Sequence, residues 1–166
     1  MTAVFSAHSV NTHAGDPAHA TTAWVVVASE DHVQLAVHGG FIQAGHGKHS
    51  AVARFAAGDT VICYSPKCFF ERKDLCQSFT ALGEIADVVP AQVRVNDQFA
   101  PFRRAVKWRP VRSARIKPLI PQLSFIVNKQ SWGYKFRFGV FPIPDKDAQR
   151  IAAAMSVATM NVAMMS

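Results

Sequence analysis

The segment HGGFIQAGHGKHSAV, residues 38–52, combines a flexible backbone with side chains that could bind a ligand. Its glycines surround Phe41, Gln43, His46 and Lys48, and the segment contains no acidic residue. A Phe ring can stack on a planar heterocycle, and Gln offers both a donor and an acceptor to its polar edge. His46 and Lys48 add a titratable ring and a cation beside glycines that allow close backbone approach. We interpret the segment as a pocket wall for a nucleobase-like ligand; a core position for Phe41 and a plain surface loop are the alternatives.

A second aromatic group, Trp132 and Tyr134, precedes the last predicted strand. Trp132 could form another wall of such a pocket, or it could close the end of a barrel. Trp24 and Trp108 fit core positions better, because each stands in an apolar strand pattern.

The charge of the chain is positive and regional. There are 18 Lys and Arg against 11 Asp and Glu, which gives a net charge of +7. Between Arg94 and Arg137, eleven basic residues face a single acid, Asp97. In residues 101–110, alternation places Arg103, Lys107 and Arg109 on one face and Arg104 with the apolar residues on the other. This distribution predicts contacts with nucleic-acid phosphates, although ordinary solubility is an alternative.

The residues favour binding over catalysis. His46 and His49 with Cys63 and Cys68 lack zinc-finger spacing, and we expect neither a metal nor a cofactor. No phosphate-binding glycine loop or G-x-S-x-G motif is present. The rival interpretations are a small hydrolase that uses His46 or a cysteine, and a sensor of a nucleotide-like small molecule. Three cysteines without a secretory signal predict reduced thiols and a cytoplasmic protein without membrane association.

These residues must be positioned by short elements. We predict a disordered leader over 1–22, a domain over 23–156 and a C-terminal tail over 157–166. Within the domain, the apolar patterns predict strands at 23–29, 60–65, 78–89, 101–110 and 134–143, with a loop over 66–76. Helices are expected after Ser29, over 48–56 and over 145–155, with Ser29 as a cap of the first and Gly39 as its left-handed stop. The predicted fold is α+β: a mixed, mostly antiparallel barrel of five to six strands with short flanking helices.

The order of motifs along residues 23–155 resembles a known family. It runs from a strand opening with Trp through GGFIQAGHGK, GDTVICYSP, FTALGEI, FRRAVKW and LSFI to WGYKFRFGVF. This order is similar to that of the EVE domains, which belong to the PUA-like superfamily and are distant relatives of YTH domains. The resemblance implies a small β-barrel and a pocket that accepts a flipped, modified base in DNA or RNA.

The resemblance also suggests site positions. Ser29, with Glu30 and Asp31, stands where relatives place polar groups against the base edge. Phe41 stands where YTH proteins have a cage Trp. Ser65 and Lys67 lie in the segment that leads to another cage wall, which Phe69, Phe70 or Trp132 could supply.

Overall fold

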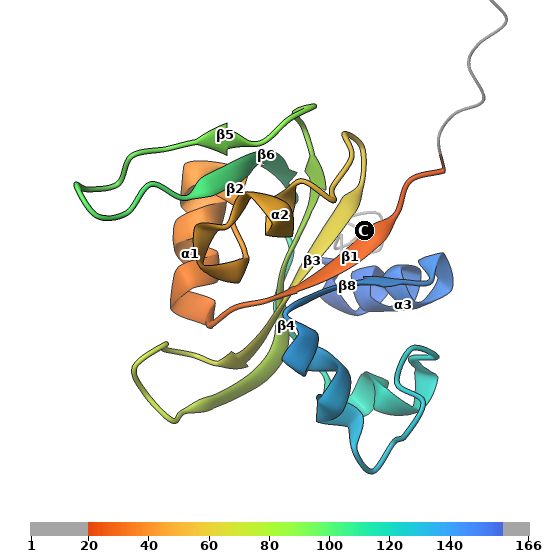
Figure 1. Cartoon of the computed structure of the whole chain (residues 1–166). Coiled ribbons are helices and arrows are strands. Elements are labelled where there is room, and N and C mark those ends of the chain that lie inside the picture. The colour runs from red at the N-terminus through yellow and green to blue at the C-terminus, as the bar shows by residue number, and fades with distance from the viewer. Residues whose placement is uncertain (1–19, 158–166) are drawn as a thin grey trace, which may run out of the picture.

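The computed structural model describes residues 20–157, which form an α+β fold around a curled, half-barrel sheet (Figure 1). The strand order is β2-β6-β4-β3-β1-β8, with β5 paired to β6 and β7 paired to β4. Among the described strands, β1 and β3 pair in parallel and the other pairs are antiparallel. The predicted fold class is therefore confirmed. The leader and tail predictions fall almost entirely on residues outside the described range.

The strands are β1 (Ala23–Val27), β2 (Phe41–Ile42), β3 (Thr60–Lys67), β4 (Leu75–Ile85), β5 (Ala91–Gln92), β6 (Phe102–Trp108), β7 (Ala114–Arg115) and β8 (Val140–Ile143). The helices are α1 (Glu30–Gly39), α2 (His49–Val52) and α3 (Asp145–Met155). Three 3₁₀ helices, η1 (Gly45–Gly47), η2 (Lys117–Gln122) and η3 (Trp132–Phe138), complete the description. No helix within residues 20–157 is long and apolar enough to cross a membrane.

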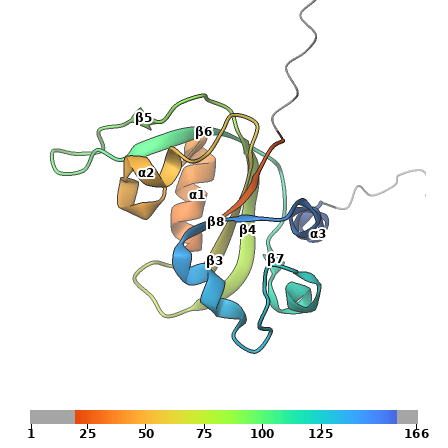
Figure 2. The same ribbon diagram turned by 45° about the vertical axis from the view of Figure 1, so that its right-hand side comes forward.

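Alternate residues of the central strands feed two cores on opposite faces of the sheet. Val61 and Cys63 of β3 pack with α1 and α2, whereas Ile62 and Tyr64 pack with α3, η2 and η3. Figure 2 shows α1 and α2 on one side of the curled sheet and α3 on the other. The apolar runs predicted as buried strands are buried on both faces for this reason.

Strand β6 follows the predicted alternation. Arg104 and Val106 point into the protein, while Lys107 is exposed and Arg103 is half-buried. The Arg104 side chain is fully buried and donates to the Asp87 carboxylate at 2.7 Å and to the carbonyl oxygens of Val52 and Phe55. A buried guanidinium needs such partners, because an unpaired charge is costly in a core.

The predicted strand over 134–143 is wrong in its first half. Residues 132–138 form η3, and only Val140–Ile143 pairs with β1. The alternating aromatic residues of this stretch resemble a strand pattern, but Gly139 adopts φ 74°, which ends η3 and turns the chain into β8. The local pattern could not distinguish these outcomes.

The hairpin between β3 and β4 is longer than predicted. β3 continues through Pro66 to Lys67, and β4 begins at Leu75 and ends at Ile85. The register shifts between Ser65 and Lys67, so Pro66 sits where the regular pairing is interrupted. Gly83 is not at a bulge; a Cβ there would lie 2.6 Å from Val106 Cγ1, so the glycine permits close packing of β4 on β6.

The ends of α1 also differ from prediction. Ser29 occupies the N-cap position, but its side chain makes no capping hydrogen bond. Gly40, not Gly39, is the left-handed residue after the helix, with φ 70°. Gly39 instead lies against the Phe41 ring, where a Cβ would approach Cε1 to 2.5 Å.

Candidate nucleic-acid interface

Several predicted site residues gather where β1 and β3 end. Because these strands are parallel, the residues that follow them meet at one edge of the sheet. The N–H of Ala28 donates to the Tyr64 oxygen at 3.1 Å, which places Ser29 next to the end of β3. Ser65 and Lys67 belong to that end. We call this region the β1–β3 end.

Ser29 carries a buried hydroxyl without a partner. Ser29 is 5% exposed, and its Oγ makes no hydrogen bond within the described part of the chain. The hydroxyl lies close enough to the Asp31 carboxylate to lower the pKa of that group, although it makes no hydrogen bond as short as 3.5 Å to it. A buried polar group without a hydrogen bond lowers the stability of the fold by about 1–3 kcal/mol. A ligand that supplies the missing hydrogen bond would recover this free energy on binding. Ser65, by contrast, is satisfied, because its Oγ and Thr80 Oγ1 share a hydrogen bond of 2.7 Å.

The β3–β4 hairpin contacts the first turn of α1. The Asp31 N–H donates to the Cys68 oxygen at 3.0 Å, and the Asp31 carboxylate accepts the Phe70 N–H at 3.4 Å. Slight burial raises the pKa of this carboxyl, but the nearby Ser29 hydroxyl and the N–H groups of Phe70 and His32 lower it more, so the pKa lies below its usual value. Lys67 Nζ donates to the Phe70 oxygen at 3.0 Å and lies 5.7 Å from that ring centre. Lys67 is therefore held over the hairpin.

The helix η3 is attached to the same end of the sheet. The Val27 N–H donates to the Gly139 oxygen at 2.8 Å, directly after η3. The ring of Phe136 packs on Tyr64 with centroids 4.1 Å apart, and Trp132 packs edge-on against Phe136 at 6.2 Å. Trp132 is half-buried, whereas Tyr134 is 61% exposed. The structure thus attaches η3, with both predicted aromatic residues, to the end of β1 and to Tyr64 of β3.

A pocket opens beside Trp132. It has a volume of about 290 Å³, close to the lower limit of typical ligand pockets. Its lining residues are Phe125, Ile126, Val127, Asn128, Ser131, Trp132, Tyr134 and Lys135. A larger hollow of about 380 Å³ lies in the exposed 92–100 hairpin and contains no predicted site residue.

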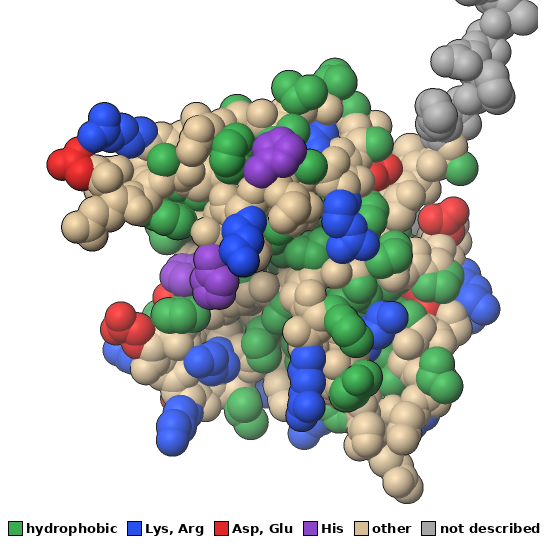
Figure 3. All heavy atoms as spheres, viewed as in Figure 1, with side chains coloured by type: hydrophobic (Ala, Val, Ile, Leu, Met, Phe, Trp, Pro, Cys, Tyr) green, Lys and Arg blue, Asp and Glu red, His purple; other side chains and the backbone are tan. Residues whose placement is uncertain are grey.

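The surface of η3 alternates aromatic rings with cations. Arg137 lies 5.8 Å from the Tyr134 ring centre, and Lys135 lies 5.7 Å from that of Phe138. Phe138, like Tyr134, is mostly exposed, at 62%. No Asp or Glu occurs between residues 98 and 144 of the sequence. Figure 3 shows Lys and Arg side chains scattered among hydrophobic ones over the face it presents.

Phe41, Gln43 and Arg103 form a separate group where β2 pairs with β6. The Arg103 guanidinium lies 3.7 Å from the centre of the Phe41 ring, and its Nε donates to Gln43 Oε1 at 2.9 Å. Partial burial lowers the pKa of Arg103. Arg103, which was predicted to contact phosphate, therefore covers one face of the Phe41 ring, which was predicted to stack on a base. Together the two side chains form a flat surface, called here the platform of Phe41 and Arg103.

His46 and Lys48 lie beside this group in the 45–48 turn, and both are exposed. His46 adopts a left-handed backbone with φ 58°, which is uncommon outside glycine. A Cβ at Gly47 would lie 2.5 Å from Pro101 Cβ, so the turn packs tightly onto the segment before β6.

Lys107 and Arg109 continue the outer face of β6, as predicted, and both are exposed. The face is not free of acids, because exposed Glu84 stands opposite Lys107 in the β4–β6 register. The outer face of β6 is therefore positively charged at Arg103 and Arg109, whereas the charge of Lys107 is offset by the neighbouring Glu84.

Helix α1 separates the two groups of predicted residues. Ser29 precedes α1 and Phe41 follows it, so the ten residues of the helix place about 15 Å between them. Figure 1 shows η3 near the start of α1 and β2 and β6 near its end. The expectation that Phe41, Ser65 and Trp132 border a single slot is therefore wrong for this structure. Ser29, Ser65, Lys67, Trp132 and Tyr134 share one region, and Phe41, Gln43 and Arg103 share another.

Sequence reasoning missed the aromatic layer under the pocket. This layer consists of the rings of Tyr64, Phe125 and Phe136. The sequence patterns assign these residues only to strands or apolar segments and predict no role for them in a site. The alternation of β3 could have indicated that Tyr64 faces away from Cys63. Nothing local could have indicated its contact with Phe136, which is 72 residues later in the sequence.

The chain is similar to bacterial proteins along most of its length. It is 43% identical to a UPF0310 protein of Mycolicibacterium vanbaalenii over 142 residues, which covers 86% of this chain and 98% of that protein. It is 34% identical to the UPF0310 protein YdcG of Bacillus subtilis over 146 residues, which covers 87% and 99%.

Among solved structures, the fold is similar to that of protein Atu2648 from Agrobacterium tumefaciens. The TM-score is 0.52 at 10% identity, with 84% of this chain and 96% of the other covered. Rpa0253 from Rhodopseudomonas palustris gives a TM-score of 0.51 at 14% identity, with 81% and 93% covered. The family description of the EVE domain matches residues 22–154. With that match and relatives above 40% identity, the chain belongs to the EVE domain family.

Proposed function

We propose that this protein is a non-catalytic module that binds nucleic acid and accommodates a flipped, modified base in the pocket beside Trp132, which η3 attaches to the β1–β3 end. The observation that carries the proposal is η3: exposed Tyr134 and Phe138 alternate with Lys135 and Arg137 beside a pocket that contains Trp132. Aromatic faces stack on bases and cations contact phosphates, and this combination is typical of single-strand binding surfaces.

The pocket supplies what one base requires. Trp132 and Tyr134 offer ring faces, each worth about 1–3 kcal/mol when a base stacks on it. The Ser29 hydroxyl does not line this pocket and is proposed to contact a neighbouring nucleotide. Flipping a base from a duplex costs a few kcal/mol, so we expect a preference for bases that are already unpaired. A methyl group buried on the base would add about 0.8 kcal/mol.

The environment of the thiols supports a non-catalytic role. Burial raises the pKa of Cys63 to about 12. Burial, and next the charge of Glu30, raise the pKa of Cys76 to about 12 as well. A cysteine nucleophile acts as its thiolate and needs a lowered pKa. These two thiols are therefore poor candidates for the hydrolase interpretation.

The outer face of β6 and the platform of Phe41 and Arg103 are proposed to contact the backbone of the same strand. Guanidinium planes also stack on bases, so Arg103 can contribute in both ways. Arg103→Ala combined with Lys107→Ala is expected to weaken binding to all sequences alike, because phosphate contacts carry no sequence information.

The test is fluorescence anisotropy with labelled single-stranded DNA and RNA, with and without a modified base, over a series of salt concentrations. For the parent protein, affinity should fall as salt rises, with a logarithmic slope of about −0.7 per phosphate contacted. Trp132→Ala and Tyr134→Ala should each weaken binding about 5- to 100-fold, which corresponds to one lost stacking contact. Arg137→Ala should reduce the slope by about 0.7.

Matched controls come from exposed positions elsewhere in the fold. Phe99→Ala removes an exposed ring from the 92–100 hairpin, and Lys146→Ala removes an exposed cation from α3. Neither control should change the affinity or the slope. Equal binding by the parent and by a folded Trp132→Ala, Tyr134→Ala double variant would reject the base pocket. A flat salt dependence with retained binding of a free nucleoside would favour a small-molecule sensor instead.

A further inference from the structure

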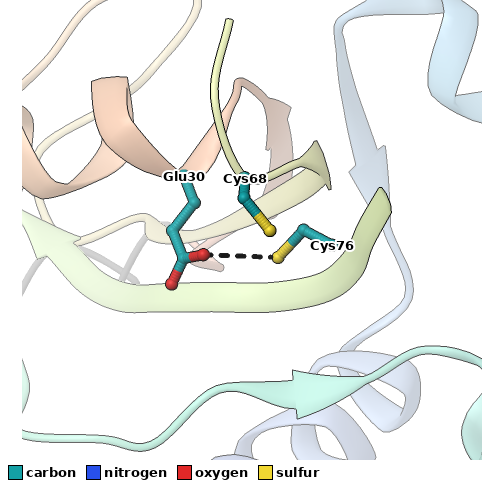
Figure 4. Close-up of side chains that lie close together, drawn as sticks. All are labelled: Glu30, Cys68 and Cys76. Carbon is teal, nitrogen blue, oxygen red and sulfur yellow. Dashed lines mark hydrogen bonds between the residues drawn. The ribbon is translucent and has the colours of Figure 1, made fainter. Parts of the chain in front are cut away.

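A cluster of three metal-ligating side chains lies at the β1–β3 end. Glu30 belongs to the first turn of α1, Cys68 follows β3, and Cys76 lies in β4. One ligand atom from each residue lies within 4.8 Å of the other two. Figure 4 shows the Glu30 carboxylate and the two sulfur atoms directed toward a common point. The residues are far apart in sequence, and the fold alone brings them together.

We propose that Glu30, Cys68 and Cys76 form a binding site for a thiophilic divalent cation of the zinc class. Two sulfur ligands and one carboxylate favour such a cation over magnesium or calcium, which prefer oxygen ligands. Three protein ligands leave a fourth tetrahedral position for water or another small ligand. This proposal is independent of the proposed nucleic-acid binding.

The distances fit a tetrahedral site after small side-chain movements. Zinc–sulfur bonds of about 2.3 Å and zinc–oxygen bonds of about 2.1 Å place two sulfur ligands about 3.8 Å apart, and a sulfur and an oxygen about 3.6 Å apart. Cys76 Sγ already lies 3.5 Å from Glu30 Oε2, to which it donates a hydrogen bond. The remaining separations of up to 4.8 Å must shorten by about 1 Å, which side-chain rotation supplies.

The backbone around the cluster is fixed. The Cys68 N–H donates to the Asp74 oxygen at 3.2 Å, and the Cys68 oxygen accepts the Asp31 N–H at 3.0 Å. Ser78 Oγ donates to the Cys76 oxygen at 2.8 Å. Ligands held by such contacts lose little freedom when they bind a metal, which favours binding.

The charges around the cluster also favour a cation. Glu30 forms no ion pair with a basic side chain within residues 20–157. Lys67, the basic residue next to Cys68, directs its Nζ to the Phe70 oxygen instead. All three cluster residues are only half-buried, so an ion can enter from solvent. A divalent cation would balance the carboxylate and the thiolates that form when it displaces their protons.

The experiment is a titration of the reduced, full-length chain with Co²⁺, followed by absorption, and then displacement with Zn²⁺. Cobalt bound by thiolates gives an intense sulfur-to-metal charge-transfer band, whereas imidazole ligands give none. The band therefore distinguishes this site from His8, His13 and His19 near the N-terminus. We expect saturation at one equivalent, loss of the band on Zn²⁺ addition, and release of protons on binding.

The variants assign the ligands. Cys68→Ser and Cys76→Ser should abolish the band. Glu30→Gln should weaken binding at least 10- to 100-fold, which is the loss seen when a group that only orients a metal ligand is changed. Cys63→Ala is the matched cysteine control, because Cys63 packs in the core with α1 and α2, and it should keep the band. Glu84→Gln, at an exposed position of β4, is the matched acid control and should also leave binding unchanged.

A second measurement does not depend on the folding of any variant. Zn²⁺ should protect Cys68 and Cys76 of the parent protein from iodoacetamide, as read by mass spectrometry of the peptides. The absence of a charge-transfer band at stoichiometric Co²⁺, or a band that survives Cys68→Ser and Cys76→Ser, would overturn the proposal. So would the finding that the small amount of glutathione disulfide in a mainly reduced glutathione buffer oxidises Cys68 and Cys76 to a disulfide and is itself reduced to two glutathione thiols, because the pair would then be a redox couple.

Discussion

Two buried polar side chains, Arg104 and Ser29, differ in whether their polar atoms are hydrogen-bonded. Arg104 lies within β6, is fully buried, and donates to the Asp87 carboxylate and to three backbone carbonyl groups. Ser29 lies immediately before α1, is nearly as buried, and its hydroxyl makes no hydrogen bond within residues 20–157. The buried guanidinium of Arg104 is therefore paired with hydrogen-bond acceptors, whereas the buried hydroxyl of Ser29 is available for a hydrogen bond to a ligand.

The difference indicates which region serves stability and which serves binding. Arg104 joins β6 to the end of α2 and to the segment after β4, so it fixes the outer part of the sheet. Ser29 belongs to the β1–β3 end, which also contains the Glu30, Cys68 and Cys76 cluster, and η3 attaches the pocket of Trp132 to the end of β1. Unsatisfied buried groups are rare in native structures, and each one requires an explanation.

The strongest test of this comparison is Arg104→Ala. The substitution leaves Asp87 and the carbonyl groups of Val52 and Phe55 without their partner, and breaking a buried ion pair in this way costs about 3–5 kcal/mol. Urea unfolding followed by circular dichroism measures the loss. The control is Arg103→Ala at the adjacent, outward-facing position, which should cost much less. A loss below about 1 kcal/mol for Arg104→Ala would contradict the structural role assigned to it.

Asp147→Ala should have the next largest effect. Its buried carboxylate accepts the N–H groups of Ser124 and Phe125 at 2.9 Å each, and the Ser124 hydroxyl at 2.8 Å. Leaving such donors unsatisfied costs about 1–3 kcal/mol, and the shift of Phe125 should also disturb the pocket beside Trp132. The control is Asp145→Ala in the exposed first turn of α3, for which unfolding curves should move far less. Equal curves for the two variants would refute the prediction.

A third test concerns the buried thiol of Cys63. Burial raises its pKa from the usual 9.0 to about 12. Between these values the unfolded chain loses the proton while the folded chain keeps it, so the unfolded state binds fewer protons. The free energy of unfolding should therefore fall as pH rises through this window, by about 1.4 kcal/mol per pH unit from this group. Cys63→Ala should show a correspondingly smaller slope in urea titrations at several pH values; parallel slopes would contradict the assignment.

The smallest stability effect is expected for Ser29→Ala. No hydrogen bond is lost, and the gain from removing an unsatisfied hydroxyl is offset in part by the space that it leaves, so the free energy of unfolding should not fall by more than about 0.5 kcal/mol. Ser65→Ala is the matched control, because it leaves Thr80 Oγ1 unpaired and should cost about 1–3 kcal/mol. Ser29→Ala should nevertheless weaken oligonucleotide binding in the anisotropy assay. A variant that is destabilised like Ser65→Ala would mean that Ser29 has a structural partner after all.

Local patterns predicted much of the fold. The alternation in residues 101–110 placed Arg104 inside and Lys107 outside, because side chains of a strand point to opposite faces in turn. The apolar runs at 23–29 and 60–65 predicted β1 and most of β3 for a similar reason. The same reasoning failed at residues 134–138, where the residues of η3 show a strand-like alternation but Gly139 turns the chain.

The candidate site was predictable only in part. The family resemblance grouped Ser29 with Ser65 and Lys67, and these residues lie where β1 and β3 end, but the parallel pairing that brings them together was not predicted. The grouping of Phe41 with Trp132 failed because the sequence shows how long α1 is but not on which side of the sheet η3 returns. The Phe41–Arg103 contact was also hidden, since it depends on the pairing of β2 with β6 across 62 residues.

The sequence by itself determined the acid-free basic region, the buried strands and the inward and outward faces of β6, because these follow from composition and from periods of a few residues. The tertiary structure alone decided that Glu30 meets Cys68 and Cys76, that the Ser29 hydroxyl finds no hydrogen-bond partner among residues 20–157, and that Phe41 and Trp132 lie at different ends of α1. The physical reason is that these features depend on how the sheet curls and where distant segments pack, and no local preference of the chain encodes such distances.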